Sequence, residues 1–209
     1  MADERSVVEL HRGLKRFLMV YQFGIDEMMT KINILRDEFS YVHDYNPIEH
    51  VKSRLKSPES ILAKAQRYGL PRGLTAIREN IRDVAGIRIT CSFTSDVYRI
   101  MEMVTRQGDV TVIEIEDYIA EPKPNGYRSV HVIVEIPVFM SDRVESVYVE
   151  LQIRTVAMDF WASLEHKIYY KHDRAVPGEL REELRLAAEA ARDLDLRMES
   201  LHERVHGKT

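Results

Sequence analysis

Apolar residues recur at steps of three and four through the N-terminal part of the chain. Between about Ser6 and Phe39 they form one stripe, made of Leu10, Leu14, Phe17, Tyr21, Ile25, Met28, Ile32, Leu35 and Phe39. This period is that of an amphipathic helix with one buried face. Gly24 lies in the middle of the stripe, so the pattern fits either a bent helix or two helices, and it predicts a packing role.

The middle of the chain, from about Asn46 to Thr155, mixes two patterns. Ser57 followed by Pro58 combines a cap residue with proline at the first helical position and predicts a short helix, and residues 96–107 predict another. Four runs predict strands: GIRITCSF (86–93), VTVIEIEDYI (110–119), SVHVIVEIPVF (129–139) and SVYVELQIRT (146–155). Helices and strands mixed at this spacing indicate an α+β or α/β sheet domain.

From Val156 the pattern becomes helical again, with a break at Pro177 and Gly178. After the break, the apolar residues alternate steps of four and three: Leu180, Leu184, Ala187, Ala191, Leu194, Met198, Leu201 and Val205. This heptad seam must be covered, either by the N-terminal helix of the same chain or by another subunit. We expect a contact between subunits of a homo-oligomer.

Alternation along the predicted strands sends successive side chains to opposite sides of the sheet. Residues 86–93, 129–136 and 146–155 each separate an apolar face from a polar one. The polar face then carries Arg88, Thr90, Ser92, Ser129, His131, Tyr148, Glu150, Gln152 and Arg154. One interpretation is the solvated outer face of an ordinary antiparallel sheet, and the other is a binding surface.

Two carboxylates close to the polar face favour a binding surface. Asp83 comes immediately before one strand, and Glu150 lies within another. A pair of carboxylates at a shared cleft is a usual way of holding Mg2+ for phosphate chemistry.

Basic residues lie in the same part of the sequence. On the short predicted helix, Ser60, Lys64 and Arg67 fall on one face. Arg54 and Lys56 are placed in the loop before its cap. Basic side chains on one surface suit the oxygens of a triphosphate. For a helix considered alone, a solvated charged face explains the same stripe.

Residues 123–131, KPNGYRSVH, combine a turn with aromatic and basic side chains. Pro-Asn-Gly supplies the turn. A turn has no need of Tyr127, nor of Lys123 and Arg128 on either side, and His131 interrupts the strand that follows. A polar loop entering a half-buried strand explains the stretch by itself; together with the carboxylates and basic residues, it indicates a binding loop.

The composition is compatible with the predicted sheet domain and binding surface and adds few further constraints. The chain has 209 residues, enough for one large or two small domains, and its formal net charge of -4 argues against a dedicated nucleic-acid binder. Cys91 is the only cysteine, and it fits a small core residue in a reducing compartment. The sequence has no signal peptide and no apolar run of membrane-spanning length, so we expect a cytoplasmic protein.

The absence of several common motifs limits how the chain could bind phosphates or a metal. The sequence has no GxxxxGK[ST] or GxGxxG loop, no HExxH and no paired-cysteine metal site, so side chains must hold any bound phosphate. Asp193 and Asp195 imitate a DxD pair, but residues two apart on a helix diverge, which predicts that this pair lies on the surface.

Five blocks, in order and in register, carry a resemblance to a known family. They are NPIEHVKSRLKSPESI, RDVAGIRITCSF, DYIAEPKPNGYRSVHV, VELQIRT and AMDFWASLEHKIYYK. With these blocks the chain resembles the RelA/SpoT family, in particular the single-domain small alarmone synthetases of the RelQ/RelP type. The resemblance implies an α+β fold, a mixed β-sheet flanked by helices and related to nucleotidyltransferases. It also implies transfer of pyrophosphate from ATP to the 3′-hydroxyl of GDP or GTP, with AMP as the by-product.

The same resemblance implies roles for individual residues. Arg54 and Arg88 would sandwich the adenine of ATP. The ATP phosphates would meet Lys56, Ser60, Lys64 and Arg67. Asp83 and Glu150 would hold Mg2+, and Glu150 would be the general base. The GDP or GTP acceptor would meet Lys123, Asn125, Tyr127, His131, Gln152 and Ala162, with Tyr127 stacked on the guanine.

The resemblance further implies one synthetase domain over residues 1–209 and a tetramer. The domain would consist of an N-terminal helical part (1–45), a catalytic sheet core (46–172) and a C-terminal helix (173–209). No stretch is left for a metal-dependent hydrolase domain, so no hydrolase activity is expected. Two alternatives keep the same fold: a catalytically silent nucleotide sensor, and an RNA-binding module that uses the basic stripe from Arg54 to Arg67.

Overall fold

The computed structural model describes residues 2–71, 73–171 and 177–207, and the side chains of residues 12–71, 73–168 and 177–207. Its elements are, in chain order, α1 (Ala2–Val42), β1 (Ile48–Leu55), α2 (Pro58–Arg67), α3 (Leu74–Asn80), β2 (Ala85–Cys91), α4 (Thr94–Thr105), β3 (Thr111–Asp117), β4 (Val130–Phe139), β5 (Val144–Thr155), α5 (Val156–Lys171) and α6 (Gly178–His206). Within the described residues, no helix combines the length and the apolar character that crossing a membrane requires.

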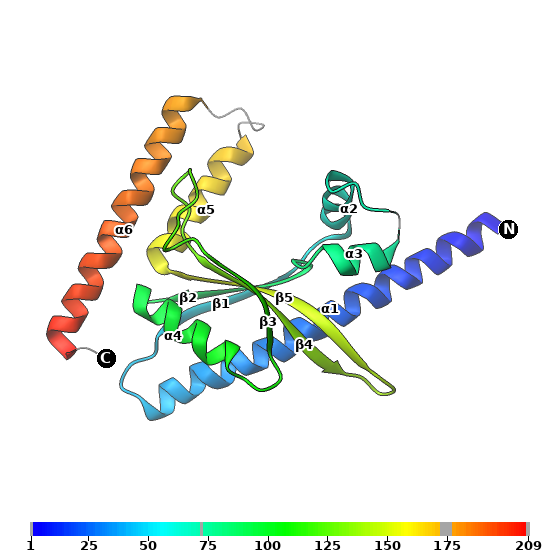
Figure 1. Ribbon diagram of the computed structural model, residues 1–209, viewed down its shortest axis with the longest axis horizontal. Helices are drawn as coiled ribbons and strands as arrows, with labels where there is room; N and C mark the ends of the chain where they lie inside the picture. Colours follow the sequence, from blue (N-terminus) through cyan, green and yellow to red (C-terminus); the bar gives the residue numbers. More distant parts are fainter. Residues whose placement is uncertain (1, 72, 172–176, 208–209) are drawn as a thin grey trace.

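The strands form one five-stranded sheet in the order β1-β2-β5-β4-β3. β2 and β5 are parallel, and the other neighbours are antiparallel. The sheet is therefore mixed and flanked by helices, and the predicted fold class is confirmed. Helices α1 and α4 lie below the sheet in Figure 1, α2 and α3 lie above one end of it, and at the other end α5 rises above the sheet while α6 runs alongside from top to bottom.

The apolar face of the sheet packs on α1 and α4, as the alternation predicts. Ile87, Ile89, Val149 and Leu151 are fully buried in the core that these helices share with the sheet. α1 is a single helix through Gly24. A side chain at Gly24 would come within 2.6 Å of Val147, so glycine here allows the helix to approach β5 closely.

The sequence pattern missed β1, and the placement of Arg54 in a loop is wrong. Arg54 lies within this strand and pairs in register with Gly86 of β2. β1 is an edge strand, and an irregularity between Ile48 and His50 shifts its register. Apolar residues therefore do not alternate along it, and most of its side chains are exposed, which hides the usual strand signal.

The predicted N-cap at Ser57 is confirmed. Its hydroxyl oxygen accepts a hydrogen bond of 3.3 Å from the Ser60 amide at the start of α2. The predicted boundary between the catalytic core and the C-terminal helix falls at residues 172 and 173, which lie outside the described residues. α6 itself begins at Gly178.

Candidate functional site

The register of the strands brings the predicted site residues together in two rows across the polar face. One row contains Arg54, Gly86 and Glu150 on β1, β2 and β5. The next row contains Arg88 and Gln152, followed by His131 on β4. Strands that are distant in the sequence thus place their polar side chains side by side, between α2 at one end of the sheet and α5 at the other (Figure 1).

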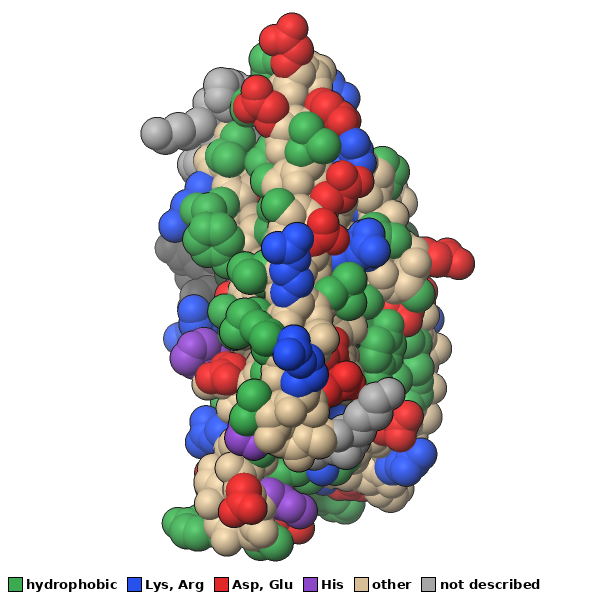
Figure 2. Space-filling view, turned by 90° about the vertical axis from the view of Figure 1, so that its left-hand side faces the viewer, with side chains coloured by type: hydrophobic (Ala, Val, Ile, Leu, Met, Phe, Trp, Pro, Cys, Tyr) green, Lys and Arg blue, Asp and Glu red, His purple; other side chains and the backbone are tan. Residues whose placement is uncertain are grey.

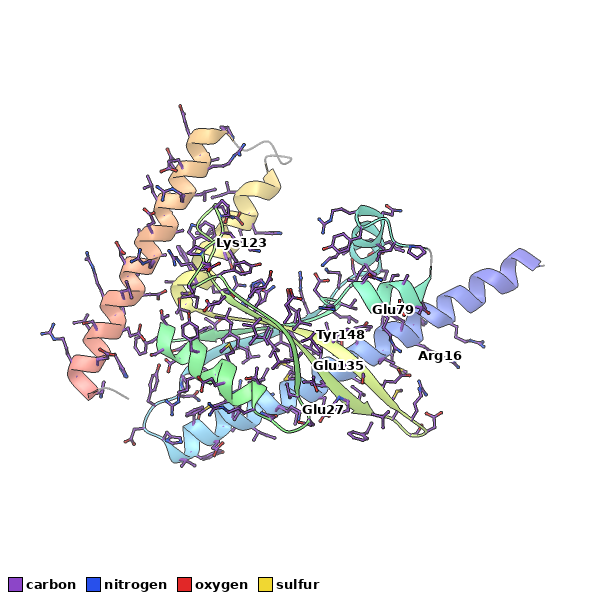
Figure 3. All side chains as sticks on the ribbon, viewed as in Figure 1. Arg16, Glu27, Glu79, Lys123, Glu135 and Tyr148 are labelled. Carbon is purple, nitrogen blue, oxygen red and sulfur yellow. The ribbon has the colours of Figure 1, made fainter. Side chains whose placement is uncertain are left out.

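Two adjoining pockets open on this face, and Glu150 lines both. The first, which we call the arginine pocket, is lined by Lys52, Ser53, Arg54, Gly86, Ile87, Arg88, Glu150 and Gln152. The second, which we call the acidic pocket, has a volume of about 370 Å³ and is lined by Lys64, Tyr68, Glu79, Asn80, Arg82, Asp83, Glu114, Glu116, Ile133 and Glu150. In Figure 3, Glu79 on α3 and Lys123 in the loop before β4 mark opposite ends of the polar face.

Two lysines hold Asp83. Lys56 Nζ lies 2.5 Å and Lys64 Nζ 2.9 Å from Asp83 Oδ2. Burial disfavours the carboxylate, but the hydrogen bonds and charges of the two lysines outweigh this effect and keep the pKa of Asp83 below its ordinary value. The other carboxylate oxygen, Oδ1, is buried without a hydrogen-bond partner. Asp83 is therefore ionised at neutral pH, with one oxygen left for a further ligand.

Glu150 has a different environment. Burial and the negative charge of Asp83 raise its pKa above the ordinary value, although Gln152 donates a hydrogen bond of 2.9 Å to its Oε2. Its Oε1 lies 3.7 Å from Nδ1 of His131. Burial and the charge of Lys123 lower the pKa of His131 to about 4, so this histidine is neutral at pH 7 and the contact is not an ion pair. A carboxylate with a raised pKa in a cleft is suited to accept a proton.

The loop before β4 forms the turn that the sequence predicts. The Gly126 amide donates a hydrogen bond of 2.8 Å to the Lys123 carbonyl, and Gly126 has a φ of 89°. The ring of Tyr127 is half-buried against the cluster of Trp161, Leu184 and Ala188, so it rests on α5 and α6. Its hydroxyl lies 2.7 Å from His131 Nε2.

The other predicted acceptor residues gather around this loop. Lys123 Nζ lies 5.3 Å from the centre of the Tyr127 ring. Asn125 donates a hydrogen bond of 3.1 Å to Glu165 on α5, and Ala162 packs in the same cluster as Tyr127. The structure thus brings the residues assigned to the acceptor to one end of the polar face.

Two predicted residues of α2, Ser60 and Arg67, line neither pocket. Ser60 is exposed on the first turn of α2, and its hydroxyl accepts a hydrogen bond of 3.1 Å from Ser57. Arg67 is exposed on the last turn, with its guanidinium 5.5 Å from the centre of the Tyr68 ring. Both remain on the helix that carries Lys64, and their assignment to a phosphate path stays a prediction.

Sequence reasoning missed several residues that contact the site. Asp159 on α5 forms ion pairs with Arg88 and Arg154, and Glu165 accepts the hydrogen bond of Asn125. Arg154 was placed on the polar face without a role, and the structure buries it beneath α5. The helical pattern after Val156 gave no sign that its acidic residues face the sheet.

Asp83 and Glu150 fit a magnesium ion. The described residues contain no group of three or more His, Cys, Asp or Glu side chains arranged to hold a metal by themselves. Mg2+ in phosphate-binding sites usually takes only one or two carboxylates and completes its shell with phosphate oxygens and water. The free Asp83 Oδ1 and the Glu150 carboxylate on the same pocket meet this requirement.

Comparison with known proteins adds independent evidence. The family model described as "Region found in RelA / SpoT proteins" matches residues 53–175. The chain is 48% identical over 205 residues to the GTP pyrophosphokinase YwaC of Bacillus subtilis, covering 98% of this chain and 96% of that one. It is 40% identical to the GTP pyrophosphokinase YjbM of the same organism, covering 91% and 89%. The solved structure of small alarmone synthetase 1 from Bacillus subtilis, bound to its product pppGpp, superposes with a TM-score of 0.86 at 39% identity, covering 93% of this chain and 99% of that one.

Proposed function

The chain belongs to the RelA/SpoT family, and we propose that it is an alarmone synthetase that transfers pyrophosphate from ATP to the 3′-hydroxyl of GDP or GTP and releases AMP. Glu150 carries this proposal, because it lies where the arginine pocket meets the acidic pocket and also contacts His131 of the acceptor end. One carboxylate is thus shared by every part of the site.

The arginine pocket is the proposed donor site. Arg54 and Arg88 present guanidinium groups from neighbouring strands, and planar guanidinium groups stack on aromatic rings such as adenine. Gly86 pairs with Arg54 across the two strands and lines the same pocket, where a Cβ would make only ordinary contact, at 3.5 Å, with the Arg54 side chain. Lys64 lines the adjoining acidic pocket, and Lys56 contacts the same Asp83 carboxylate as Lys64, so both ammonium groups are placed to suit the ATP phosphates.

The loop of residues 123–131 is the proposed acceptor site. The ring of Tyr127 offers a surface on which guanine stacks, Asn125 and Ala162 adjoin the base edge, and Lys123, His131 and Gln152 adjoin the ribose and phosphates. These assignments rest on the family resemblance together with the gathering of the side chains at one end of the sheet.

In the proposed reaction, the 3′-oxygen of the acceptor forms a bond to the β-phosphorus of ATP, and the bond from this phosphorus to the oxygen of the α-phosphate breaks. Glu150 takes the hydroxyl proton, and AMP leaves. Asp83 and Glu150 would hold Mg2+, which supplies charge neutralisation of the phosphates when bound. The lysines on Asp83 fix its carboxylate and keep it ionised.

Cytoplasmic location and a homotetramer are also part of the proposal. ATP and guanine nucleotides are cytoplasmic substrates. The tetramer is supported by α6, whose stripe facing the rest of the subunit contains Leu184, Ala188 and Asp195. The heptad seam shares Leu184 with this stripe, and its members Leu194 and Leu201 are 54% and 50% exposed. Figure 2, which views the α6 side of the molecule, shows hydrophobic side chains along both flanks of a helix.

Product analysis tests the proposed function. The protein is incubated with Mg2+, labelled ATP and GDP, GTP or GMP, and the nucleotides are separated. We expect AMP and a 3′-pyrophosphorylated guanine nucleotide in equal amounts. Glu150→Gln keeps the size of the side chain but removes the base and a negative charge, and should lower the rate by ~100-fold or more.

Glu135→Gln is the matched control, because Glu135 lies on the same face of the sheet on β4 and lines neither pocket. It should retain wild-type turnover. A fall of less than about tenfold in Glu150→Gln would contradict the role of this residue, and release of phosphate or AMP without a guanine product would contradict the proposed reaction.

A further inference from the structure

One carboxylate of α5 joins two arginines of the sheet. Asp159 lies in the first turn of the helix, and its Oδ1 is 3.4 Å from a terminal nitrogen (Nη1) of Arg88 and 3.1 Å from Nε of Arg154. Within the part of the chain that the structure describes, these are the only ion pairs of either arginine. A single carboxylate thus forms ion pairs, without hydrogen-bond geometry, with two guanidinium groups on adjacent strands.

Arg154 is the fixed member of this group. It is only 2% exposed, although arginine is rarely buried unless it is paired. Its Nη2 donates a long hydrogen bond of 3.5 Å to Gln152 Oε1, and Gln152 in turn donates one of 2.9 Å to Glu150. Arg154 is therefore held between Asp159 at one end and the site at the other.

Arg88 is the more exposed member of this group. Its side chain is 37% exposed and lines the arginine pocket together with Arg54. A guanidinium group that stacks on a base must present its plane, and an exposed arginine side chain has many rotamers. The contact with Asp159 removes part of this freedom before a ligand arrives, which is how preorganisation strengthens binding.

We propose that Asp159 is a positioning residue for the donor nucleotide: it orients Arg88 in the arginine pocket and takes its own position from buried Arg154. The inference rests on the proposed function only in naming the adenine of ATP as the group that Arg88 meets. Asp159 itself does not line the arginine pocket, so it acts through Arg88.

Direct binding measurements test the inference. Calorimetry with a non-hydrolysable ATP analogue, and separately with GDP, is carried out on the wild type, Asp159→Asn, Arg88→Ala and the double variant. Asp159→Asn keeps the shape but loses the charge, and it should weaken the analogue about tenfold, as expected for loss of a charge-assisted contact. Binding of GDP should change less than about twofold. The double variant should bind the analogue no more weakly than Arg88→Ala alone, because both changes remove the same interaction.

Two further variants separate positioning from stability. Asp142→Asn removes an exposed carboxylate that also pairs with an arginine, Arg143, and should bind both nucleotides as the wild type does. Asp159→Glu retains the charge and should bind the analogue more tightly than Asp159→Asn. A thermal melt accompanies each variant.

Three results would overturn the inference: unchanged ATP-analogue binding in Asp159→Asn, equal weakening of both nucleotides with a lower melting temperature, or independent, multiplicative effects of the Asp159 and Arg88 changes. Failure of the proposed function gives a different result, since a wild type that binds both nucleotides but forms no product still allows the coupling of Asp159 to Arg88 to be measured.

Discussion

The hydroxyl of Tyr127 and Nε2 of His131 lie 2.7 Å apart, and their rings meet edge to face with centroids 5.7 Å apart. His131 is neutral, so one ring nitrogen donates and the other accepts; in the tautomer with the proton on Nδ1, which faces Glu150, Nε2 accepts a hydrogen bond from the Tyr127 hydroxyl. The tyrosine proposed to stack on guanine is thereby connected to the proposed general base through one histidine. On this proposal, the ring of Tyr127 stacks on the guanine and its hydroxyl contacts His131, and substitutions can separate these two functions.

Replacing Tyr127 tests this division. Tyr127→Phe keeps the ring, so guanine-nucleotide affinity should remain within about threefold of the wild type, while loss of the His131 contact should lower kcat about fivefold, the effect of one neutral hydrogen bond. Tyr127→Ala removes the ring and should weaken GDP binding by ~1–3 kcal/mol, the range for stacking of an aromatic side chain on a base. Calorimetry with GDP and with an ATP analogue measures both.

ATP-analogue affinity is the internal control for these two variants, because the donor site is assigned to Arg54 and Arg88. If Tyr127→Ala weakened both nucleotides equally and lowered the melting temperature, the ring would serve to pack the loop on α5 and α6 and not to bind the acceptor.

Gly126 fixes where this loop rests on α6. A Cβ at this position would lie 2.6 Å from that of Ala188, and the φ of 89° is one that residues other than glycine adopt only with strain. Gly126→Ala should therefore displace the turn and raise the KM for GDP several-fold, with little change in the KM for ATP. Gly108→Ala is the control, because a Cβ there meets nothing within 4 Å. Similar kinetics in the two variants would show that α6 does not support the acceptor loop.

Periodicity predicted the parts of the site that lie on regular strands. Alternation placed Arg88, Glu150 and Gln152 on one face, because a strand allows only two directions for its side chains. It could not order the strands, and the rows across β1, β2 and β5 depend on that order. It also could not find β1, where the register shift and the exposure of an edge strand conceal Arg54.

Contacts between distant segments were the other part that the sequence could not predict. The Asp193 and Asp195 pair was placed on the surface, which is correct for Asp193 and wrong for Asp195. Side chains two residues apart on a helix do point in different directions, but which of the two turns inward depends on a partner elsewhere in the chain. Here that partner is Thr155, whose hydroxyl donates a hydrogen bond of 2.6 Å to Asp195 Oδ2 at the end of β5. The role of Asp159 could not be predicted for the same reason, because its partners Arg88 and Arg154 lie on strands of the sheet.

The buried Asp195 makes the docking of α6 sensitive to pH. Burial raises its pKa to about 6 from an ordinary value of 3.8, with a smaller contribution from the charge of Glu199. A carboxyl whose folded-state pKa is raised contributes stability that is complete below the unfolded pKa and lost as the pH rises through about 6. Asp195→Asn retains an oxygen for Thr155 and cannot ionise. It should therefore be more stable than the wild type at pH 8, by up to ~3 kcal/mol, and much closer to it at pH 5.

Chemical denaturation at the two pH values measures this difference. Asp193→Asn removes an exposed carboxylate two residues away on the same helix, and its stability relative to the wild type should change little between pH 5 and pH 8. If Asp195→Asn were destabilised equally at both values, the carboxylate would be stabilising in its charged form and the assigned direction of the pKa shift would be wrong.

The exposed heptad seam of α6 predicts an interface with another subunit. Leu194 and Met198 line a groove of about 810 Å³ between α5 and α6 together with Phe160, which is 66% exposed. Large apolar side chains this exposed on one face are typical of a surface that is covered by another subunit. We therefore expect the wild type to be a homo-oligomer, a tetramer on the proposal above.

The Leu194→Glu and Leu201→Glu double variant should dissociate without unfolding, because both positions are half-exposed in the single subunit and a charge is costly only when another subunit buries it. Light scattering coupled to size exclusion at micromolar concentration gives the mass, and a thermal melt shows whether the dissociated subunit is folded. Leu196→Glu is the control, since Leu196 is similarly exposed but lies outside the seam. A wild type that elutes as a monomer would show that no subunit covers the seam, and a double variant that stays assembled would place the interface on another surface.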